Sequence, residues 1–254
     1  MKSSTDQHWN ERAAGIENDI EVNIMDIFQR ELEYDYVCRY LTKEMTMHEV
    51  GCGNGYSTER FREFVRHVDA FDYSENMLAR ARARVGETNN RFIHDNLLAP
   101  EHLSGPYDLV LCVRVLINLR DLGEQRRALR NLASLVGPNG LLVIVEGFVE
   151  GFTALSELRK QVGLPAVTPA KINFYSSLDD VLPELSGEFT LEDRFHLGAY
   201  DYLTRVLYPL VAGPENAKHN SIFSEKCQQL AREFNPDCFE SFSRVRGLIF
   251  RKKS

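Results

Sequence analysis

The stretch of sequence that decides the fold is Glu49-Val50-Gly51-Cys52-Gly53-Asn54-Gly55, which is followed by Tyr56-Ser57-Thr58-Glu59-Arg60-Phe61. Three alternating glycines allow a tight turn, because glycine accepts positive φ and lets the backbone approach a ligand closely. The residues after the turn are typical of the first turn of a helix, whose free N–H groups would point at the same place. The stretch therefore predicts a strand, a ligand-binding turn and a helix in succession.

Length and composition indicate one ordinary globular domain. The chain has 254 residues, of which 43% are hydrophobic and 26% are charged. This length suffices for a sizeable core. The net charge of −7 and the pI of about 5.6 argue against nucleic acid or an anionic membrane as the main partner.

The sequence also predicts a cytoplasmic protein. No apolar run is long enough to span a bilayer, and the first residues contain no signal-peptide core. The five cysteines, at positions 38, 52, 112, 227 and 238, are an odd number without CxxC spacing. We therefore expect reduced thiols and no metal site.

From residue 45 onward, strand and helix patterns alternate along the chain. The pattern predicts strands at 45–50, 67–71, 91–94, 107–113 and 141–145, with helices at 57–65, 75–85 and 125–135. Repeated units of this kind require right-handed crossovers and give a parallel, doubly wound α/β sheet. Residues 8–44, before these units, are expected to be helical.

After residue 148 the rhythm changes. Helical patterns appear at 152–162, 178–185 and 199–234, and strand patterns appear at 188–197 and 244–250. The fold class expected is therefore a Rossmann-like, mostly parallel seven-stranded sheet with helical insertions after strands five and six.

Polar residues follow the predicted strands at the ends where parallel sheets bind ligands. They are Glu49, Asp72, Asp95-Asn96, Arg114 and Glu146. A carboxylate about twenty residues after a glycine turn can accept hydrogen bonds from both hydroxyls of a ribose. Asp72 is therefore predicted to bind a ribose.

Two other classes of protein share parts of this pattern. A nicotinamide-dependent oxidoreductase would need G-x-G-x-x-G, but Tyr56 stands at the position of its last glycine, and no Tyr-x-x-x-Lys pair is present. A non-catalytic cofactor-binding partner subunit would be expected to have a damaged turn, whereas this turn is intact. Both remain as alternatives.

Four motifs together resemble the class I S-adenosylmethionine-dependent methyltransferases. The first is the glycine turn with Glu49 before it, and the second is Val68-Asp69-Ala70-Phe71-Asp72-Tyr73-Ser74-Glu75-Asn76-Met77-Leu78. The third is Tyr107-Asp108-Leu109-Val110-Leu111-Cys112, and the fourth is Leu135-Val136-Gly137-Pro138-Asn139-Gly140-Leu141-Leu142. Asn139 stands where the family usually has glycine, and asparagine tolerates the same left-handed backbone.

The resemblance implies S-adenosyl-L-methionine as cofactor, with Glu49 and the turn at its methionine end, Asp72 on its ribose and Asp95 on its adenine amino group. The cofactor-binding residues expected are Trp9, Glu49, Gly51, Cys52, Gly53, Gly55, Asp72, Tyr73, Met77, Asp95, Asn96, Leu97, Cys112, Val113 and Arg114. We expect an N-terminal helical cap over 1–44 and a methyltransferase domain over 45–254. Insertions at about 149–186 and 199–242 should cover the substrate.

The reaction implied is methyl transfer to an oxygen or nitrogen of a small polar acceptor, sugar-linked or phosphorylated. The catalytic candidates are Glu146, as a general base at the end of an apolar strand, Arg114 and Tyr175. Arg114 is expected either to clamp an anionic group or to pair with Glu146. The substrate-binding candidates are Asn118, Asn173, Tyr200, Tyr202 and Arg205. A monomer or homodimer is expected.

Overall fold

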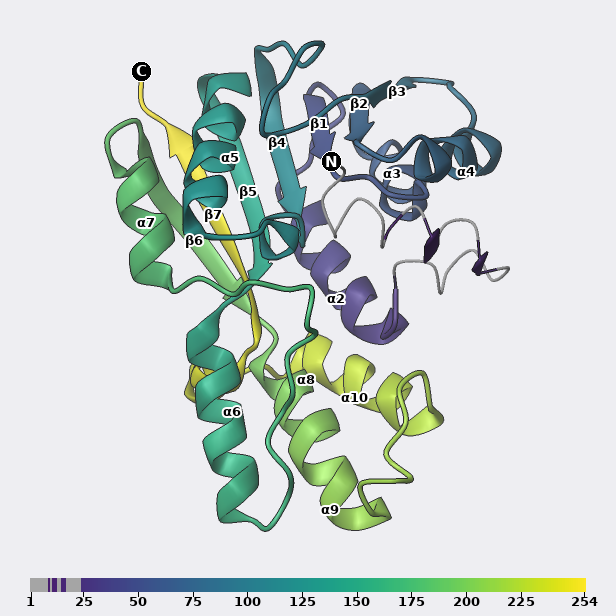
Figure 1. Ribbon diagram of the computed structural model, residues 1–254, viewed down its shortest axis with the longest axis vertical. Coiled ribbons are helices and arrows are strands. Elements are labelled where there is room, and N and C mark those ends of the chain that lie inside the picture. Colours follow the sequence, from purple (N-terminus) through teal and green to yellow (C-terminus); the bar gives the residue numbers. More distant parts are fainter. Residues whose placement is uncertain (1–8, 10, 13–14, 17–23) are drawn as a thin grey trace.

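The computed structural model describes residues 9, 11–12, 15–16 and 24–254, which contain one seven-stranded sheet of order β3-β2-β1-β4-β5-β7-β6 (Figure 1). The strands are β1 Thr46–Val50, β2 His67–Asp72, β3 Asn90–His94, β4 Tyr107–Val113, β5 Val136–Gly147, β6 Phe189–His196 and β7 Val245–Lys252. Strands β1 to β5 pair in parallel, and β7 is antiparallel to both of its neighbours. The predicted fold class is confirmed.

The helices that cover the sheet follow from the same alternation. They are α2 Ile27–Cys38, α3 Tyr56–Phe61, α4 Glu75–Val85, η1 Leu116–Asn118, α5 Leu122–Leu135 and α7 Leu178–Ser186. Helices α2, α3 and α4 pack on one face of the sheet, and α5 and α7 pack on the other. Both faces are therefore buried, as an apolar parallel strand requires.

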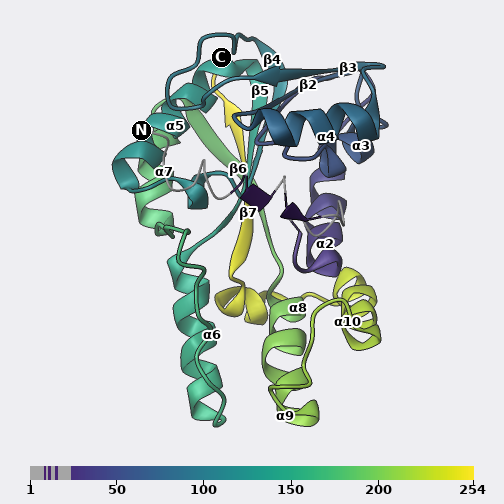
Figure 2. The ribbon, with the colours of Figure 1, turned by 45° about the vertical axis from the view of Figure 1, so that its right-hand side comes forward.

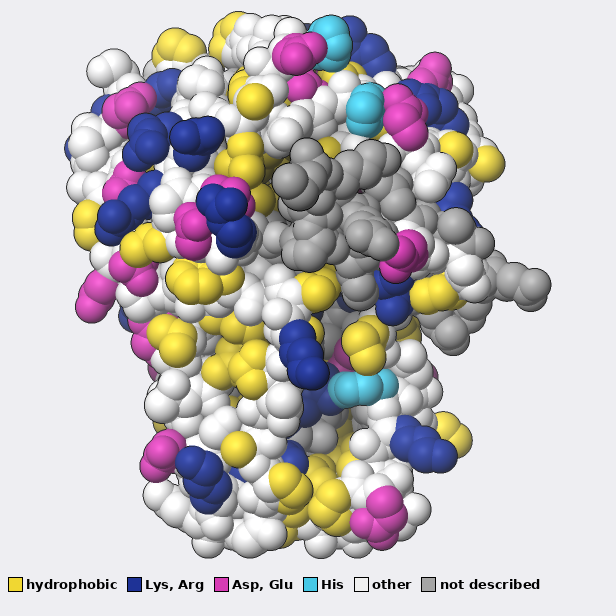
Figure 3. Space-filling model, viewed as in Figure 1, with side chains coloured by type: hydrophobic (Ala, Val, Ile, Leu, Met, Phe, Trp, Pro, Cys, Tyr) yellow, Lys and Arg dark blue, Asp and Glu magenta, His cyan; other side chains and the backbone are white. Residues whose placement is uncertain are grey.

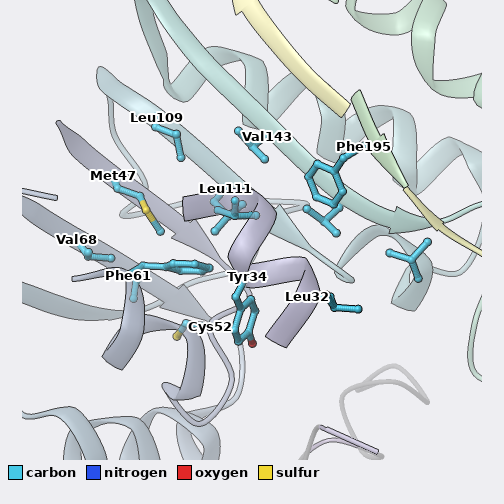
Figure 4. Packing of buried hydrophobic residues seen from close by; sticks show 14 of the residues in the cluster. Leu32, Tyr34, Met47, Cys52, Phe61, Val68, Leu109, Leu111, Val143 and Phe195 are labelled. Atoms are coloured by element: carbon cyan, nitrogen blue, oxygen red, sulfur yellow. The ribbon is translucent and has the colours of Figure 1, made fainter. Parts of the chain in front are cut away.

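The period of two along a strand sends alternate side chains to the two faces. In β4, Leu109 and Leu111 belong to the cluster under α2, α3 and α4, whereas Val110 and Cys112 belong to the cluster under α5 and α7. Figure 4 shows the first of these clusters, in which Leu111 lies near Phe61 and Tyr34. Helix α2 is therefore fastened to the core through Tyr34, which is 3% exposed.

The remaining helices form a second lobe beyond the carboxyl ends of β1, β4 and β5 (Figures 1 and 2). They are α6 Val149–Gln161, α8 Gly198–Tyr202, the π-helix η2 Leu203–Leu207, α9 Tyr208–Ala212, α10 Ile222–Glu233 and η3 Asp237–Phe242. These helices come from the two segments predicted as insertions. In the part of the chain that the structure describes, no helix is both long and apolar enough to cross a membrane.

Two predicted helices were too long. Helix α3 ends at Phe61, and Phe64, within the predicted helix 57–65, is 41% exposed, because the chain turns after Phe61 toward β2. The predicted helix over 199–234 is divided after Ala212, where Gly213 has φ 84° and Pro214 follows. Of the predicted helical segment 8–44, residues 8, 10, 13–14 and 17–23 lie outside the described residues.

Gly151 lets α6 pack closely against the segment before β7. A Cβ atom at Gly151 would lie 1.8 Å from the carbonyl oxygen of Ser243. We expect Gly151→Ala to lower the free energy of unfolding by about 2 kcal/mol, because a fixed backbone must move. Gly187→Ala is the matched control, since Gly187 has φ −64° and no atom within 4 Å of an added Cβ. Urea unfolding compares them, and equal losses would contradict the packing argument.

Candidate functional site

The glycine turn lies where the strand order reverses, between β1 and β4. Gly51, Gly53 and Gly55 have φ of 71°, 55° and 77°, a region that favours glycine. A Cβ atom at Gly51 would lie 2.4 Å from Val115 Cγ2, so the turn also needs glycine for space. The prediction of a tight backbone turn after β1 is confirmed.

Asp72, at the end of β2, connects this turn to the next one. Its Oδ2 accepts a hydrogen bond of 2.9 Å from Gly53 N–H, and its Oδ1 accepts one of 2.8 Å from Ser74 N–H. Burial raises the pKa of Asp72 to about 6, although these backbone donors oppose the rise. Each oxygen retains a lone pair for a further donor.

Glu49, at the end of β1, is a buried carboxylate beside the same turn. It accepts hydrogen bonds from the hydroxyls of Ser57 and Thr58, the second at 2.6 Å. Burial raises the pKa of Glu49 to about 7. The structure gives Glu49 no ion pair among the described residues, so its negative charge would be stabilised by a cationic ligand group.

A cavity of about 1840 Å³ extends from this turn toward the second lobe. This volume exceeds that of an ordinary single-ligand site, which is roughly 300–1,000 Å³. Of the predicted cofactor-binding residues, those that line it are Trp9, Glu49, Gly51, Cys52, Gly53, Asp72, Tyr73, Met77, Asp95, Asn96, Leu97, Val113 and Arg114. The topology thus brings together side chains from positions 9 to 114.

Two predicted cofactor-binding residues do not line the cavity. Gly55 is the residue before α3, and a Cβ there would lie 3.0 Å from Ala81, so this glycine allows α3 to pack on α4. Cys112 is fully buried on the opposite face of the sheet, and its Sγ lies 3.9 Å from Glu146 Oε1. The structure contradicts the expectation for Cys112, because the period of two in β4 turns this side chain away while Val113 lines the cavity. Contact of Gly55 with the cofactor stays a prediction.

Asp95 lines the cavity, but its carboxylate also organises the loop that follows. It accepts hydrogen bonds from the backbone N–H groups of Asn96, Glu101, His102 and Leu103, at 2.7–3.2 Å. These donors hold the pKa of Asp95 below its usual range, although burial opposes them. Recognition of an adenine by Asp95 stays a prediction.

Glu146 does not reach the cavity. It is 2% exposed, and its Oε1 accepts hydrogen bonds of 2.7 Å from Val115 N–H and Leu116 N–H. Burial raises the pKa of Glu146 to about 7, so the expected shift is present without access to a substrate. The expectation that Glu146 is the general base is therefore corrected. It is a positioning residue for the segment after β4.

Arg114 lines the cavity, and of its two expected roles the structure does not show the ion pair with Glu146. Its guanidinium pairs with the fully buried Glu33 of α2. The charge of Glu33 raises the pKa of Arg114, although burial opposes this. Arg114 has φ 55°, and its carbonyl accepts a hydrogen bond of 2.7 Å from Asn118 Nδ2.

The predicted substrate residues separate into two groups. Asn118, Asn173 and Arg205 line the cavity. Tyr200 does not, because it is fully buried and donates a hydrogen bond of 2.8 Å to Asp26 Oδ1. Tyr202 packs against Phe239, with ring centroids 5.0 Å apart. Tyr200 thus points toward α2 and Tyr202 toward η3, and the expectation for both tyrosines is corrected.

Tyr175, predicted as catalytic, also lies outside the cavity lining. Its ring packs on Phe152 with centroids 4.3 Å apart, and its hydroxyl accepts a hydrogen bond of 2.8 Å from Asn173 Nδ2. A Cβ atom at Gly147 would lie 2.6 Å from the Tyr175 ring, so this ring packs directly over the end of β5. Tyr175 therefore supports Asn173, which lines the cavity, and the expectation that Tyr175 is catalytic is corrected.

Sequence reasoning missed a polar network between α2 and the second lobe. Asp26 accepts hydrogen bonds from Tyr200 and Arg205, and Asp201 is fully buried and accepts from Arg244 at 2.7 Å. Gln29 Oε1 accepts from Arg244 at 2.9 Å. The partners in this network lie up to 215 positions apart in the chain, so no local sequence pattern predicts their contacts. The charged residues within the predicted helix 8–44 indicated only that part of this helix is polar.

Comparisons with known proteins agree with this geometry. Residues 48–140 match a family described as "Methyltransferase domain". An uncharacterized methyltransferase of Mycobacterium tuberculosis is 31% identical over 97 residues, which are 38% of this chain and 48% of that protein. The dTDP-4-amino-2,3,4,6-tetradeoxy-D-glucose N,N-dimethyltransferase of Saccharopolyspora spinosa is 30% identical over 45% of this chain and 49% of its own length.

The fold agrees over a longer range than the sequence. The N-methyltransferase NodS from Bradyrhizobium japonicum WM9, solved with S-adenosyl-L-homocysteine, has a TM-score of 0.60 at 16% identity, over 99% of this chain and 100% of that chain. The chain spans about half the length of the curated relatives named here. Residues 48–140 therefore form a methyltransferase domain, and the fold of the chain is similar to that of a solved S-adenosylmethionine-dependent methyltransferase.

Proposed function

We propose that this protein transfers a methyl group from S-adenosyl-L-methionine to an oxygen or nitrogen of a small polar acceptor, sugar-linked or phosphorylated. The observation that carries the proposal is the pair of hydrogen bonds by which Asp72 joins the glycine turn to the next loop, beside a cavity of about 1840 Å³. The likeness to a sugar N,N-dimethyltransferase supports this class of acceptor.

The residues around the turn fit the cofactor. Asp72 would accept hydrogen bonds from the ribose hydroxyls while it still holds Gly53 and Ser74. Glu49 has no ion pair among the described residues, and the ammonium of the methionine moiety would be its cationic partner. When bound, the cofactor supplies an activated sulfonium methyl group, so the chain mainly has to align the acceptor.

The chain's own residues orient the acceptor side. Glu146 fixes the backbone of Val115 and Leu116, and this positions Arg114 and Asn118 in the cavity wall. An amine acceptor that has lost its proton needs only alignment for in-line attack. A hydroxyl acceptor would in addition need a general base to accept its proton.

The domain organisation extends this proposal. Residues 1–44 would form a cap on the methyltransferase domain of 45–254, and the segments at about 149–186 and 199–242 would cover the acceptor. Asn173 and Arg205, one from each segment, line the cavity. Assembly as a monomer or homodimer and a cytoplasmic location stay predictions.

Calorimetry with S-adenosyl-L-homocysteine and with NAD separates the proposed function from a nicotinamide-dependent oxidoreductase. We expect binding of the former alone, weakened at least about tenfold in Asp72→Asn, because an amide nitrogen cannot accept from Gly53 N–H or from a ribose hydroxyl. Asp69→Asn is the matched control, since Asp69 lies on the same strand and pairs with Arg91. Preferred binding of NAD would favour an oxidoreductase.

Incubation with methyl-labelled S-adenosyl-L-methionine and a metabolite extract tests the reaction. Label in small molecules is expected, and an inactive protein that still binds the homocysteine product would indicate a non-catalytic subunit. Label found only in protein or RNA would contradict the proposal.

The affinity for S-adenosyl-L-homocysteine should depend on pH through Glu49. The pKa of Glu49 is raised to about 7, so the carboxyl is mostly protonated at pH 6 and mostly ionised at pH 8. Because the ionised form attracts the ligand ammonium, we expect about tenfold weaker binding at pH 6 than at pH 8. Calorimetry at both values measures this. Glu49→Gln should bind more weakly at pH 8 with a flatter profile, and an unchanged slope would contradict the assignment.

A further inference from the structure

The cavity is divided by charge. Five of the seven acidic residues that line it lie around the glycine turn and the loops after β2 and β3, and these are Glu49, Asp72, Glu75, Asp95 and Glu101. Six of its seven Lys and Arg residues come from α2, the segment after β4, the loop before α7, η2 and the residue before β7. These are Arg30, Arg114, Arg120, Lys171, Arg205 and Arg244.

The basic end of the cavity stands out because the chain as a whole is acidic, with a net charge of −7. Figure 3 shows Lys and Arg side chains and a histidine gathered at a hollow in the middle of one face. An acidic end suits a cofactor that carries a sulfonium and an ammonium. The basic end calls for a second ligand of the opposite charge.

Arg205 and Arg244 are two of the most buried of these cations, each less than one-sixth exposed, and they share partners. Arg244 Nη2 lies 2.7 Å from Asp201 Oδ1, and Arg205 Nε lies 3.9 Å from the same oxygen. Both also contact Gln29 Oε1, at 2.9 Å and 3.4 Å. Two guanidinium groups thus converge on one carboxylate oxygen and one amide oxygen.

The network holds more positive than negative charge. Arg205 and Arg244 lie beside Asp26 and Asp201, but Arg159 donates to the Arg205 carbonyl and adds a third guanidinium. Burial and the charge of Arg244 lower the pKa of Arg205. Arg205 Nε is buried, and none of the described residues accepts a hydrogen bond from it. An oxyanion would supply both the missing charge and the missing acceptor.

We propose that Arg205 and Arg244 bind an oxyanion group of the methyl acceptor, phosphoryl or carboxyl, so that the acceptor is an anionic small molecule. This inference rests on the proposed function and narrows its substrate class. The planar guanidinium groups would hold the anion at the far end of the cavity, and the remainder of the acceptor would extend toward the glycine turn.

Two substitutions with opposite expected effects test the proposal. Protein saturated with S-adenosyl-L-homocysteine is titrated with inorganic phosphate or with acetate, at a constant ionic strength set by chloride, and binding is followed by the line widths of the ligand in NMR. Asp26→Asn keeps an oxygen to accept from Gln29 N–H and Tyr200 but removes the charge beside Arg205. We expect the affinity for the anion to rise at least threefold.

Arg205→Gln should weaken the binding of the same anion at least threefold, whereas Arg126→Gln, whose arginine pairs with Glu184 on α5 and α7, should leave it unchanged. If Arg205→Gln does not fold, the anion affinity of Asp26→Asn still tests the proposal. The stronger of the phosphate and acetate responses identifies the group. Equal anion affinity in the wild type and Asp26→Asn would overturn the inference.

The binding of S-adenosyl-L-homocysteine separates the two levels of the proposal. If the product cofactor binds but neither anion does, the inference on the acceptor is wrong and the proposed function stands. If the product cofactor itself does not bind, the proposed function fails. With labelled S-adenosyl-L-methionine, acceptors that carry a phosphoryl or carboxyl group should show at least a threefold lower KM than their neutral esters or amides.

Discussion

The carboxylate of Asp72 is the constraint on which the site depends. Its two oxygens accept hydrogen bonds from backbone N–H groups of two separate loops, one after β1 and one after β2. The glycine turn is therefore held flat against the mouth of the cavity before any ligand arrives. A backbone N–H that is buried needs such a partner, and a charged acceptor provides a strong one.

Carboxylates accept hydrogen bonds from loop backbone N–H groups at two other strand ends as well. Asp95 gathers four backbone N–H groups of the loop after β3, and Glu146 holds two in the segment after β4. A parallel sheet leaves its loops without strand partners at this edge, so carboxylates at the strand ends serve as their acceptors. The polar residues of this edge thus divide into those that hold the backbone and those, such as Glu49, that also face the ligand.

The second lobe adds what the sheet lacks. Residues of α2, η2 and the segment before β7 meet in a network of arginines and buried acids that closes the far end of the cavity. Burying charges in this way is costly unless each has a partner, and the arginines exceed the acids there. An acidic end and a basic end in one cavity would give each of two ligands a separate electrostatic position.

The sequence by itself determined the sheet, the glycine turn and Asp72, because strand and helix periodicity and glycine conformation are local properties. It also placed Asn139, whose φ of 57° is the left-handed backbone expected there. It misplaced Glu146, Cys112 and three tyrosines, because which way a side chain points depends on the packing of elements distant in the chain. Only the tertiary structure joined Asp26 to Arg205 across 179 positions, since ion pairs of this kind follow from the fold and leave no pattern in the sequence.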